Sequence, residues 1–325
     1  MSVTIKDIAN IAGVSYSTVS KALNNSPLVK KETKDRIVKI AEEMGYEPNF
    51  AAQRLVLKQT KVIGLIWPTI ERVVLSTLVT NISKEINKTP YSMILSVDPV
   101  QQSIDTFRRF QVDGIILFEE NVDDFVKANS IPVVSYGVST KSTPDYPIID
   151  ANHEQAMYQA IKHLFELGHK QIGYIGYFSP KDSMQMAKLN GFKTAMTNYG
   201  LNINEQFLID TEGLDWYDGY AATNKLLNLK SRPTAIVGGS YDISGGIIRA
   251  IKEKNLMIPN DISIISYDNV PQMANMEVPL TCIGVPVDKL ASEIVKSTIN
   301  LIEDKEQAPF IKKMTPEMIE RTSTA

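Results

Sequence analysis

Hydroxyl, amide and ammonium groups gather within a short stretch near the amino terminus. Tyr16, Ser17, Thr18, Lys21 and Asn24 supply them, and no acidic residue stands among them. If this stretch is a helix whose apolar residues turn inward, these side chains lie on or near its outer face. Such groups hydrogen-bond phosphates and base edges, so the stretch is predicted to be a helix that contacts DNA.

Two short helices joined by a tight turn are needed to position that face. Thr4 and Asp7 predict a capping box at the start of the first helix, and Ser15 can cap the second. Gly13 stands where the turn needs a positive φ. Apolar residues recur at helical spacing on both sides of this glycine: Ile5, Ile8, Ala9, Ala12, Val14, Val19 and Leu23. The pattern is that of a helix-turn-helix, although an ordinary helical hairpin with a polar outer face shares it.

A third helix and a short hinge helix are predicted next. Residues 30–45 keep their apolar positions on one side, so three helices can close a small core. Pro48 then interrupts the helical run, and the short helix predicted after it has little neighbouring structure to pack against. Paired with a dimer mate on DNA, that helix could present Ala52 for close approach and Leu55 as an apolar wedge between base steps. A plain linker helix is the alternative.

From residue 61 onward, continuously apolar runs alternate with helical stretches. Strands this apolar belong in a parallel sheet that is covered on both faces. A first series of strands is predicted at 62–66, 114–118 and 131–135, and a second series has a helix at 155–167 and strands at 172–176, 235–237 and 262–267. We therefore expect two α/β lobes in tandem, with a cleft between them that can close around a small molecule. The shape resembles that of a periplasmic sugar-binding protein.

Composition and charge divide the chain in the same way. Its 325 residues suit a small domain plus a bilobed one, and residues 1–60 carry a net charge of +3 against −6 for the rest. Only this amino-terminal part should attract DNA phosphates. Because its net charge is modest, DNA binding is expected to need a dimer. Cys282 is the single cysteine, which fits a buried apolar residue in a reducing compartment. With no visible signal peptide or membrane span, a cytoplasmic protein is expected.

Taken together, these segments resemble the bacterial lactose-repressor/galactose-repressor (LacI/GalR) transcription regulators. The motifs that carry the resemblance are Thr4 to Asn25, Tyr46-Glu47-Pro48-Asn49, Ala52-Gln53-Arg54-Leu55, Leu167-Gly168-His169, Gly191-Phe192, Pro233-Thr234-Ala235, Ile258-Pro259, Tyr267-Asp268 and Arg321-Thr322-Ser323. The resemblance implies that Tyr16, Ser17 and Lys21 read the major groove and that Leu55 enters the minor groove. Lys21 stands where many members have arginine, so the preferred operator is expected to differ.

The same resemblance points to a small-molecule effector in the cleft. Asp268 follows a strand at the place of an effector-binding aspartate, Lys188 replaces a common effector-binding arginine, and Trp216 is expected to stack on a sugar ring. Ser240-Tyr241 and Asn152-His153 depart from common Asn-Asp and Asp-Asn pairs. Ser240 is nevertheless expected among the effector-binding residues, because it occupies the place of the first residue of the Asn-Asp pair. The alternatives are a turn or cap residue for Asp268, a solvated charge for Lys188 and a core aromatic for Trp216.

We predict a sequence-specific transcription regulator, a repressor, controlled by a carbohydrate or related metabolite. The expected partners are double-stranded operator DNA, the effector and further copies of the chain, in a homodimer or a tetramer. Its expected domains are a head (1–48), a hinge helix (49–60) and an effector and dimerisation domain (61–325). No enzyme motif, cofactor or metal is indicated; His153, His163 and His169 lack metal-ligand spacing. A cytoplasmic solute-binding protein and a regulator that answers to a protein corepressor are the alternatives.

Overall fold

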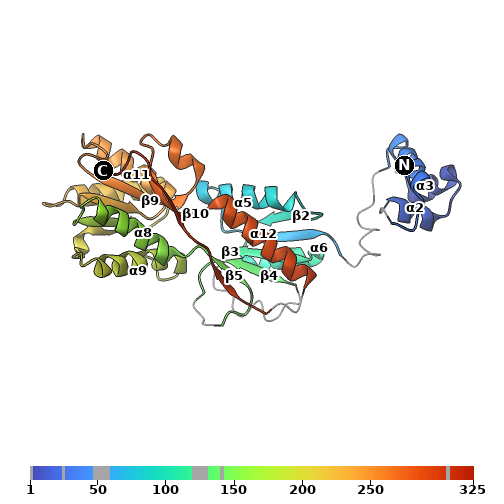
Figure 1. Ribbon diagram of the computed structural model, residues 1–325, viewed down its shortest axis with the longest axis horizontal. Helices are drawn as coiled ribbons and strands as arrows, with labels where there is room; N and C mark the ends of the chain where they lie inside the picture. Colours follow the sequence, from blue (N-terminus) through green and yellow to red (C-terminus); the bar gives the residue numbers. More distant parts are fainter. Residues whose placement is uncertain (1–2, 24–25, 47–58, 119–130, 140–142, 305–307) are drawn as a thin grey trace. The chain divides into compact units, whose positions relative to one another are not determined.

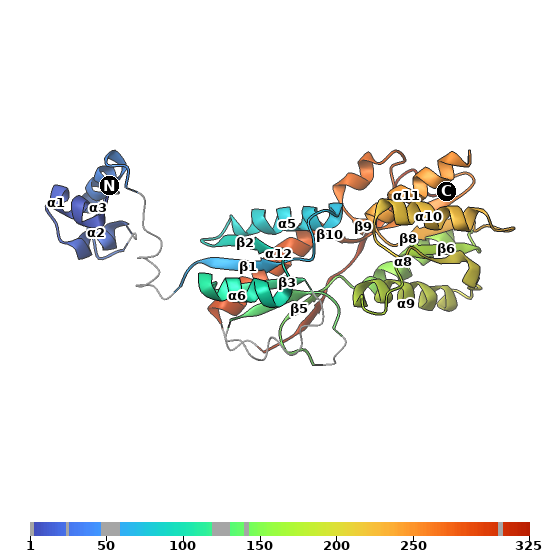
Figure 2. The same cartoon turned by 180° about the vertical axis from the view of Figure 1, so that it is seen from behind.

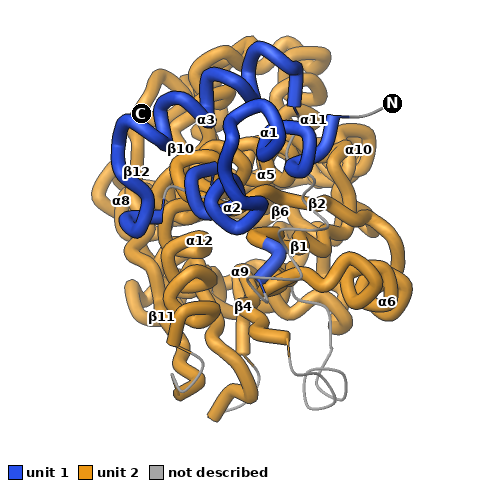
Figure 3. The backbone as a smooth tube through the Cα atoms, turned by 90° about the vertical axis from the view of Figure 1, so that its right-hand side faces the viewer, with its two compact units in different colours: residues 1–60 blue, residues 61–325 orange. Residues whose placement is uncertain are grey.

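The computed structural model describes residues 3–23, 26–46, 59–118, 131–139, 143–304 and 308–325. The chain divides into two compact units, residues 1–60 and 61–325, coloured separately in Figure 3. Each unit has its own buried apolar core. We describe the two units in turn.

The described part of the smaller unit contains α1 (Ile5–Ala12), α2 (Tyr16–Leu23) and α3 (Lys31–Glu43), as Figures 1 and 2 together show. The Thr4 N–H donates to Asp7 Oδ2 at 2.8 Å and the Thr18 N–H donates to Ser15 Oγ at 3.2 Å, so both predicted caps are confirmed. Gly13 has a φ of +63°, as the turn requires. The three helices bury one common core, made of Ile8, Ala9, Ala12, Val19, Ala22, Ile37 and Ala41.

The first lobe of the larger unit is a parallel sheet in the order β11-β5-β4-β3-β1-β2. Its strands are β1 (Val62–Ile66), β2 (Ser92–Ser96), β3 (Gly114–Phe118), β4 (Val133–Tyr136), β5 (Ile148–Asp150) and β11 (Ile311–Lys313). Helices α5 (Val73–Ile86) and α12 (Val287–Glu303) pack on one face, and α6 (Val100–Phe110) packs on the other (Figures 1 and 2). Both faces are therefore covered, as the apolar runs predict.

The second lobe has the sheet order β12-β10-β9-β8-β6-β7, in which only β12 pairs antiparallel among the described strands. Its strands are β6 (Ile172–Gly176), β7 (Leu208–Asp210), β8 (Ala235–Gly238), β9 (Ser263–Asn269), β10 (Thr281–Pro286) and β12 (Glu317–Ile319). Helices α8 (His153–Glu166) and α9 (Ser183–Asn198) cover one face, while α10 (Trp216–Leu227) and α11 (Tyr241–Glu253) cover the other. The short 3₁₀ helices are η1 (Glu205–Phe207) and η2 (Pro271–Asn275).

The chain passes between the lobes after β5, after β10 and after β11. Figure 1 shows α12 lying in the first lobe, and the dark red end of the chain passing from β11 in the first lobe to β12 in the second. Strands β5 and β9 both end beside the crossing region, so the residues at their carboxyl ends reach the space between the lobes. In open α/β sheets this is where ligands bind.

Candidate DNA-reading helix and effector cleft

The predicted outer face of α2 is exposed to solvent. Tyr16 is 53% exposed, Ser17 and Lys21 are exposed, and Thr18 is half-buried. The Ser15 hydroxyl lies 2.9 Å from Ser17 Oγ and 2.8 Å from Thr18 Oγ1, so these small hydroxyls already have local partners. The face therefore presents a phenol and an ammonium group, which suit phosphates and base edges. Asn24, Ala52 and Leu55 lie outside the described residues, and their roles stay predictions.

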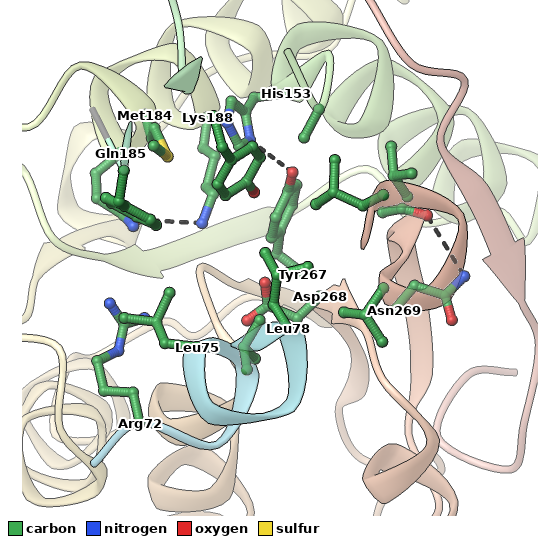
Figure 4. A pocket seen from close by; sticks show the side chains of 18 residues that line it. Arg72, Leu75, Leu78, His153, Met184, Gln185, Lys188, Tyr267, Asp268 and Asn269 are labelled. Atoms are coloured by element: carbon green, nitrogen blue, oxygen red, sulfur yellow. Dashed lines mark hydrogen bonds between the residues drawn. The ribbon is translucent and has the colours of Figure 1, made fainter. Parts of the chain in front are cut away.

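A cleft of about 600 Å³, part of it open to solvent, lies in the larger unit between residues of both lobes (Figure 4). The first lobe contributes mainly apolar and aromatic side chains, and the second contributes most of the polar ones. The lining residues that carry polar or aromatic groups are Arg72, Phe118, Tyr136, His153, Gln185, Lys188, Tyr267, Asp268 and Asn269. A concave site with an apolar wall and a few convergent polar groups is the usual form of a small-molecule site.

Lys188 reaches this cleft from α9 and is only 4% exposed. Its ammonium donates to the Gly239 carbonyl at 2.9 Å, lies 3.4 Å from Gln185 Oε1, and sits 4.0 Å from the centre of the Tyr267 ring. Burial lowers the pKa of Lys188 to about 8, although nearby Asp268 acts in the opposite direction. The alternative of a solvated surface charge is therefore wrong.

Asp268 lies near the carboxyl end of β9 and also lines the cleft. Its backbone has a φ of +87°, an uncommon conformation for a residue other than glycine. One carboxylate oxygen, Oδ2, accepts a hydrogen bond from the Tyr241 N–H at 2.9 Å, at the start of α11. The aspartate thus combines the cleft position implied by the family resemblance with the cap role that was its alternative.

A buried pair of side chains joins α8 to β9 at the cleft wall. His153 Nδ1 and the Tyr267 hydroxyl are 2.5 Å apart, and both side chains are buried. Burial, and secondarily Lys188, holds the pKa of His153 well below its usual range, and burial raises the pKa of Tyr267 well above its own. Both groups are therefore neutral near pH 7. The other ring nitrogen of His153, Nε2, is buried without a hydrogen-bond partner among the described residues.

Ser240 and Trp216 do not line the cleft. Ser240 is fully buried and caps α11, with its hydroxyl accepting from the Ile243 N–H at 3.4 Å. Trp216 begins α10, is 46% exposed, and stacks on Tyr220 with ring centres 5.6 Å apart. A core aromatic, the alternative for Trp216, is thus wrong as well. The structure brings Lys188 and Asp268 together and leaves these other two residues outside.

Arg72 is a cleft residue that sequence reasoning missed. It precedes α5, and its side chain is 17% exposed. Its Nε lies 3.7 Å from Asp242 Oδ2, so an ion pair links the first lobe to α11 in the second. Burial raises the pKa of Asp242 to about 6, while Arg72 acts against that shift. A lone arginine before a helix carries no periodic signal, and only the fold places it opposite Lys188.

Comparisons with known proteins cover both units. The family described as "Bacterial regulatory proteins, lacI family" matches residues 4–49, and "Periplasmic binding protein-like domain" matches residues 161–324. Catabolite control protein A from Priestia megaterium is 32% identical over 319 residues, covering 92% of this chain and 95% of the relative. The transcriptional repressor PurR from Pasteurella multocida is 31% identical and covers 98% of both chains.

Solved structures share the fold. A lac repressor dimer bound to operator and the anti-inducer ONPF superposes with a TM-score of 0.87 at 24% identity, over 100% of this chain and 99% of that one. A LacI-family regulator from Enterococcus faecium with bound ribose gives a TM-score of 0.73 at 26% identity, over 81% of this chain and 98% of its own.

Neither a metal centre nor a membrane helix was found in the part of the chain that the structure describes. Its histidine, cysteine, aspartate and glutamate side chains form no group that could hold a metal ion. Among the helices described, none combines the length and the apolar character that crossing a bilayer requires. With a matching head, a matching effector domain and relatives aligned over nearly its whole length, the chain belongs to the LacI family of bacterial regulatory proteins and is a DNA-binding transcription regulator, not an enzyme.

Proposed function

We propose that this regulator is a cytoplasmic repressor whose affinity for its operator changes when a small carbohydrate or related metabolite binds in the cleft. The observation that carries the proposal is the convergence of Lys188, Asp268 and Gln185 on a space that both lobes enclose. Hydrogen-bonding groups beside aromatic rings suit a polyhydroxylated ligand. The ribose-bound relative from Enterococcus faecium supports the carbohydrate class.

The DNA-binding half of the proposal rests on α2. Tyr16 and Lys21 present a phenol and an ammonium group on an exposed face without acidic residues, and Ser17 and Thr18 add hydroxyls. Asn24 would extend that face, while Ala52 and Leu55 would enter the minor groove from the hinge. One head carries few positive charges, so two heads on adjacent half-sites are needed for tight binding. We therefore propose a homodimer at least, with a tetramer as the other possible assembly.

Within this proposal, residues 1–48 form the head, 49–60 the hinge helix, and 61–325 the effector and dimerisation domain. A ligand controls the head only if it binds two arrangements of the lobes with different affinity. Contacts between the lobes supply the elements that would change: the Arg72–Asp242 ion pair and the hydrogen bond from Gln272 Nε2 to Thr77 Oγ1 at 3.0 Å. A change in lobe angle would move the paired hinge segments and so alter minor-groove insertion.

Lys188 and Asp268 carry the effector assignment, whereas Ser240 and Trp216 have no support from the cleft. A coupling free energy of about 1–3 kcal/mol between the two sites would change operator affinity by roughly 5- to 150-fold. An inducer would weaken operator binding, and a small-molecule corepressor would strengthen it.

Selection of bound duplexes from a random DNA pool by the purified full chain tests this function. The selection is done at a stated salt concentration, because phosphate contacts make affinity strongly salt-dependent. It is then repeated with neutral sugars, sugar acids and sugar phosphates. We expect a palindromic site whose occupancy one class of ligand changes. If no sequence is enriched at any salt concentration, the chain is a solute-binding protein with an inactive head; if a site is enriched but no small molecule alters it, a protein corepressor becomes the better explanation.

A further inference from the structure

The charged side chains on the cleft wall do not balance. Arg72 and Lys188 are positive, and Asp268 is the one acidic residue of the described lining. Asp268 already accepts a backbone hydrogen bond from Tyr241, and His153 is neutral because burial lowers its pKa. Among the lining residues alone, two positive side chains thus stand against one negative side chain, and Asp242, which forms an ion pair with Arg72, lies outside the lining.

Within the described part of the chain, the Arg72 side chain has few hydrogen-bond partners. A guanidinium has five N–H donors in a planar fork that matches carboxylate and phosphate oxygens. No described residue accepts a hydrogen bond from the Arg72 side chain, and its Nε is buried without such a partner. Its contact with Asp242 is 3.7 Å long, which is an ion pair but too long for a hydrogen bond. Arg72 thus has donors to offer to a molecule in the cleft.

The Lys188 ammonium likewise has no acidic hydrogen-bond partner among the described residues. Its hydrogen-bond acceptors, the Gly239 carbonyl and the Gln185 amide oxygen, are both neutral. Among the described residues, no carboxylate lies within ion-pair distance of its ammonium. Burial has the largest effect on the pKa of Lys188; Asp268 raises this pKa, and Arg72 lowers it by a smaller amount, so the two cations are close enough to repel each other. No described carboxylate pairs directly with this buried ammonium, and a bound anion would supply such a partner.

We infer that the effector carries an anionic group, a carboxylate or a phosphate, that binds between Lys188 and Arg72. The inference rests on the proposed function, because it names the class of ligand for the same cleft. Figure 4 shows the two basic side chains approaching the cavity from α9 and from the start of α5, which belong to different lobes. An anion held by both would join the lobes, while Asp268 would remain available to accept hydrogen bonds from ligand hydroxyls.

The test compares ligands that differ in charge and proteins that differ in one cation. Thermal unfolding of the full chain is measured with glucose, glucuronate, glucose 6-phosphate, acetate and inorganic phosphate, each against sodium chloride at equal ionic strength. We expect anions to raise the melting temperature of the wild type beyond the chloride control, whereas glucose does so less. For the anion that stabilises most, Lys188→Met and Arg72→Leu should each weaken binding about thirtyfold or more in isothermal titration. The carboxylate and phosphate arms identify which anion the site prefers.

Lys193→Met is the matched control, because Lys193 lies on the same helix, is exposed and pairs with Glu205 outside the cleft. This variant should keep the full anion response. Equal responses to anions in the wild type, K188M and R72L, or no response beyond chloride, would overturn the inference. A neutral sugar that stabilises the protein and alters operator binding would also overturn it, yet would leave the proposed function intact. If anions bind in the cleft but no operator sequence is found, the inference holds and the proposed function is wrong.

Discussion

Ile8→Ala in the head should abolish operator binding while leaving the effector domain folded. Ile8 is fully buried in the core that the three head helices share. Truncating a buried isoleucine to alanine removes apolar contacts and leaves a cavity, at a cost of about 2–5 kcal/mol. A domain the size of residues 4–46 has a total stability of only about 2–6 kcal/mol, from about 0.05–0.15 kcal/mol per residue. One substitution is thus comparable to the whole stability of the head.

The assay uses the distribution of tryptophans. Trp67 and Trp216 are the only ones in the chain, and both belong to the larger unit, so tryptophan fluorescence reports on that unit alone. Circular dichroism reports on helices in both units. I8A should lose helical signal and operator binding but keep the wild-type fluorescence midpoint in urea.

Ile11→Ala is the matched control, since Ile11 lies on the same helix and is 61% exposed. It should behave like the wild type within about 0.5 kcal/mol. If I8A kept operator binding with an intact helical signal, the assignment of Ile8 to an essential head core would be refuted. A shift of the fluorescence midpoint in I8A would refute the independence of the two units.

Three further outcomes are expected. Lys21→Ala should weaken operator binding by about 1–3 kcal/mol in an equilibrium binding titration. The control variant Lys39→Ala, on the exposed side of α3, should bind like the wild type. Equal losses in the two variants would mean that only the overall charge matters. Asp268→Ala should remove the effector response measured by operator release and spare operator binding itself, and a variant that still responds would remove Asp268 from the site. Burial raises the pKa of Asp242 to about 6. The folded state therefore binds a proton on this carboxyl more tightly than the unfolded chain does. As a result, the free energy of unfolding should fall as the pH rises from about 4 to about 6. Compared with Asp242→Asn, the wild type should lose up to about 3 kcal/mol of unfolding free energy across that range in urea titrations, and parallel pH profiles would contradict the assignment.

Local patterns were sufficient to predict the head and most of the sheets. Gly13 and the Thr4–Asp7 box act within a few residues, so spacing alone identifies them. Continuous apolar runs likewise predict buried parallel strands, although β4 begins at Val133 and not at residue 131. Pro132 has no N–H to donate to a neighbouring strand, which fits this later start. Short strands such as β11 have three residues and partly exposed side chains, and they carry no such pattern.

The site was less predictable because its contacts join residues far apart in the chain. Lys188 and Asp268 were found through the family resemblance, and periodicity alone would not have found them. The Tyr267–His153 contact spans 114 residues, and the position of Arg72 opposite Lys188 depends on how the lobes fold together. Ser240 and Trp216 are the reverse case: the family resemblance selects them, whereas the structure does not place them in the lining of the cleft.

The return of the chain from β10 in the second lobe to α12 in the first has a further consequence during synthesis. Residues 287–303 complete the core beneath β1, β3 and β4, and β11 adds the edge strand beside β5. The ribosome makes these pieces only after every strand of the second lobe except β12 has been made. During translation the lobe begun first must therefore wait, with the face that α12 will cover still open, until the chain is almost finished. That lobe is where we expect chaperones to bind the nascent protein.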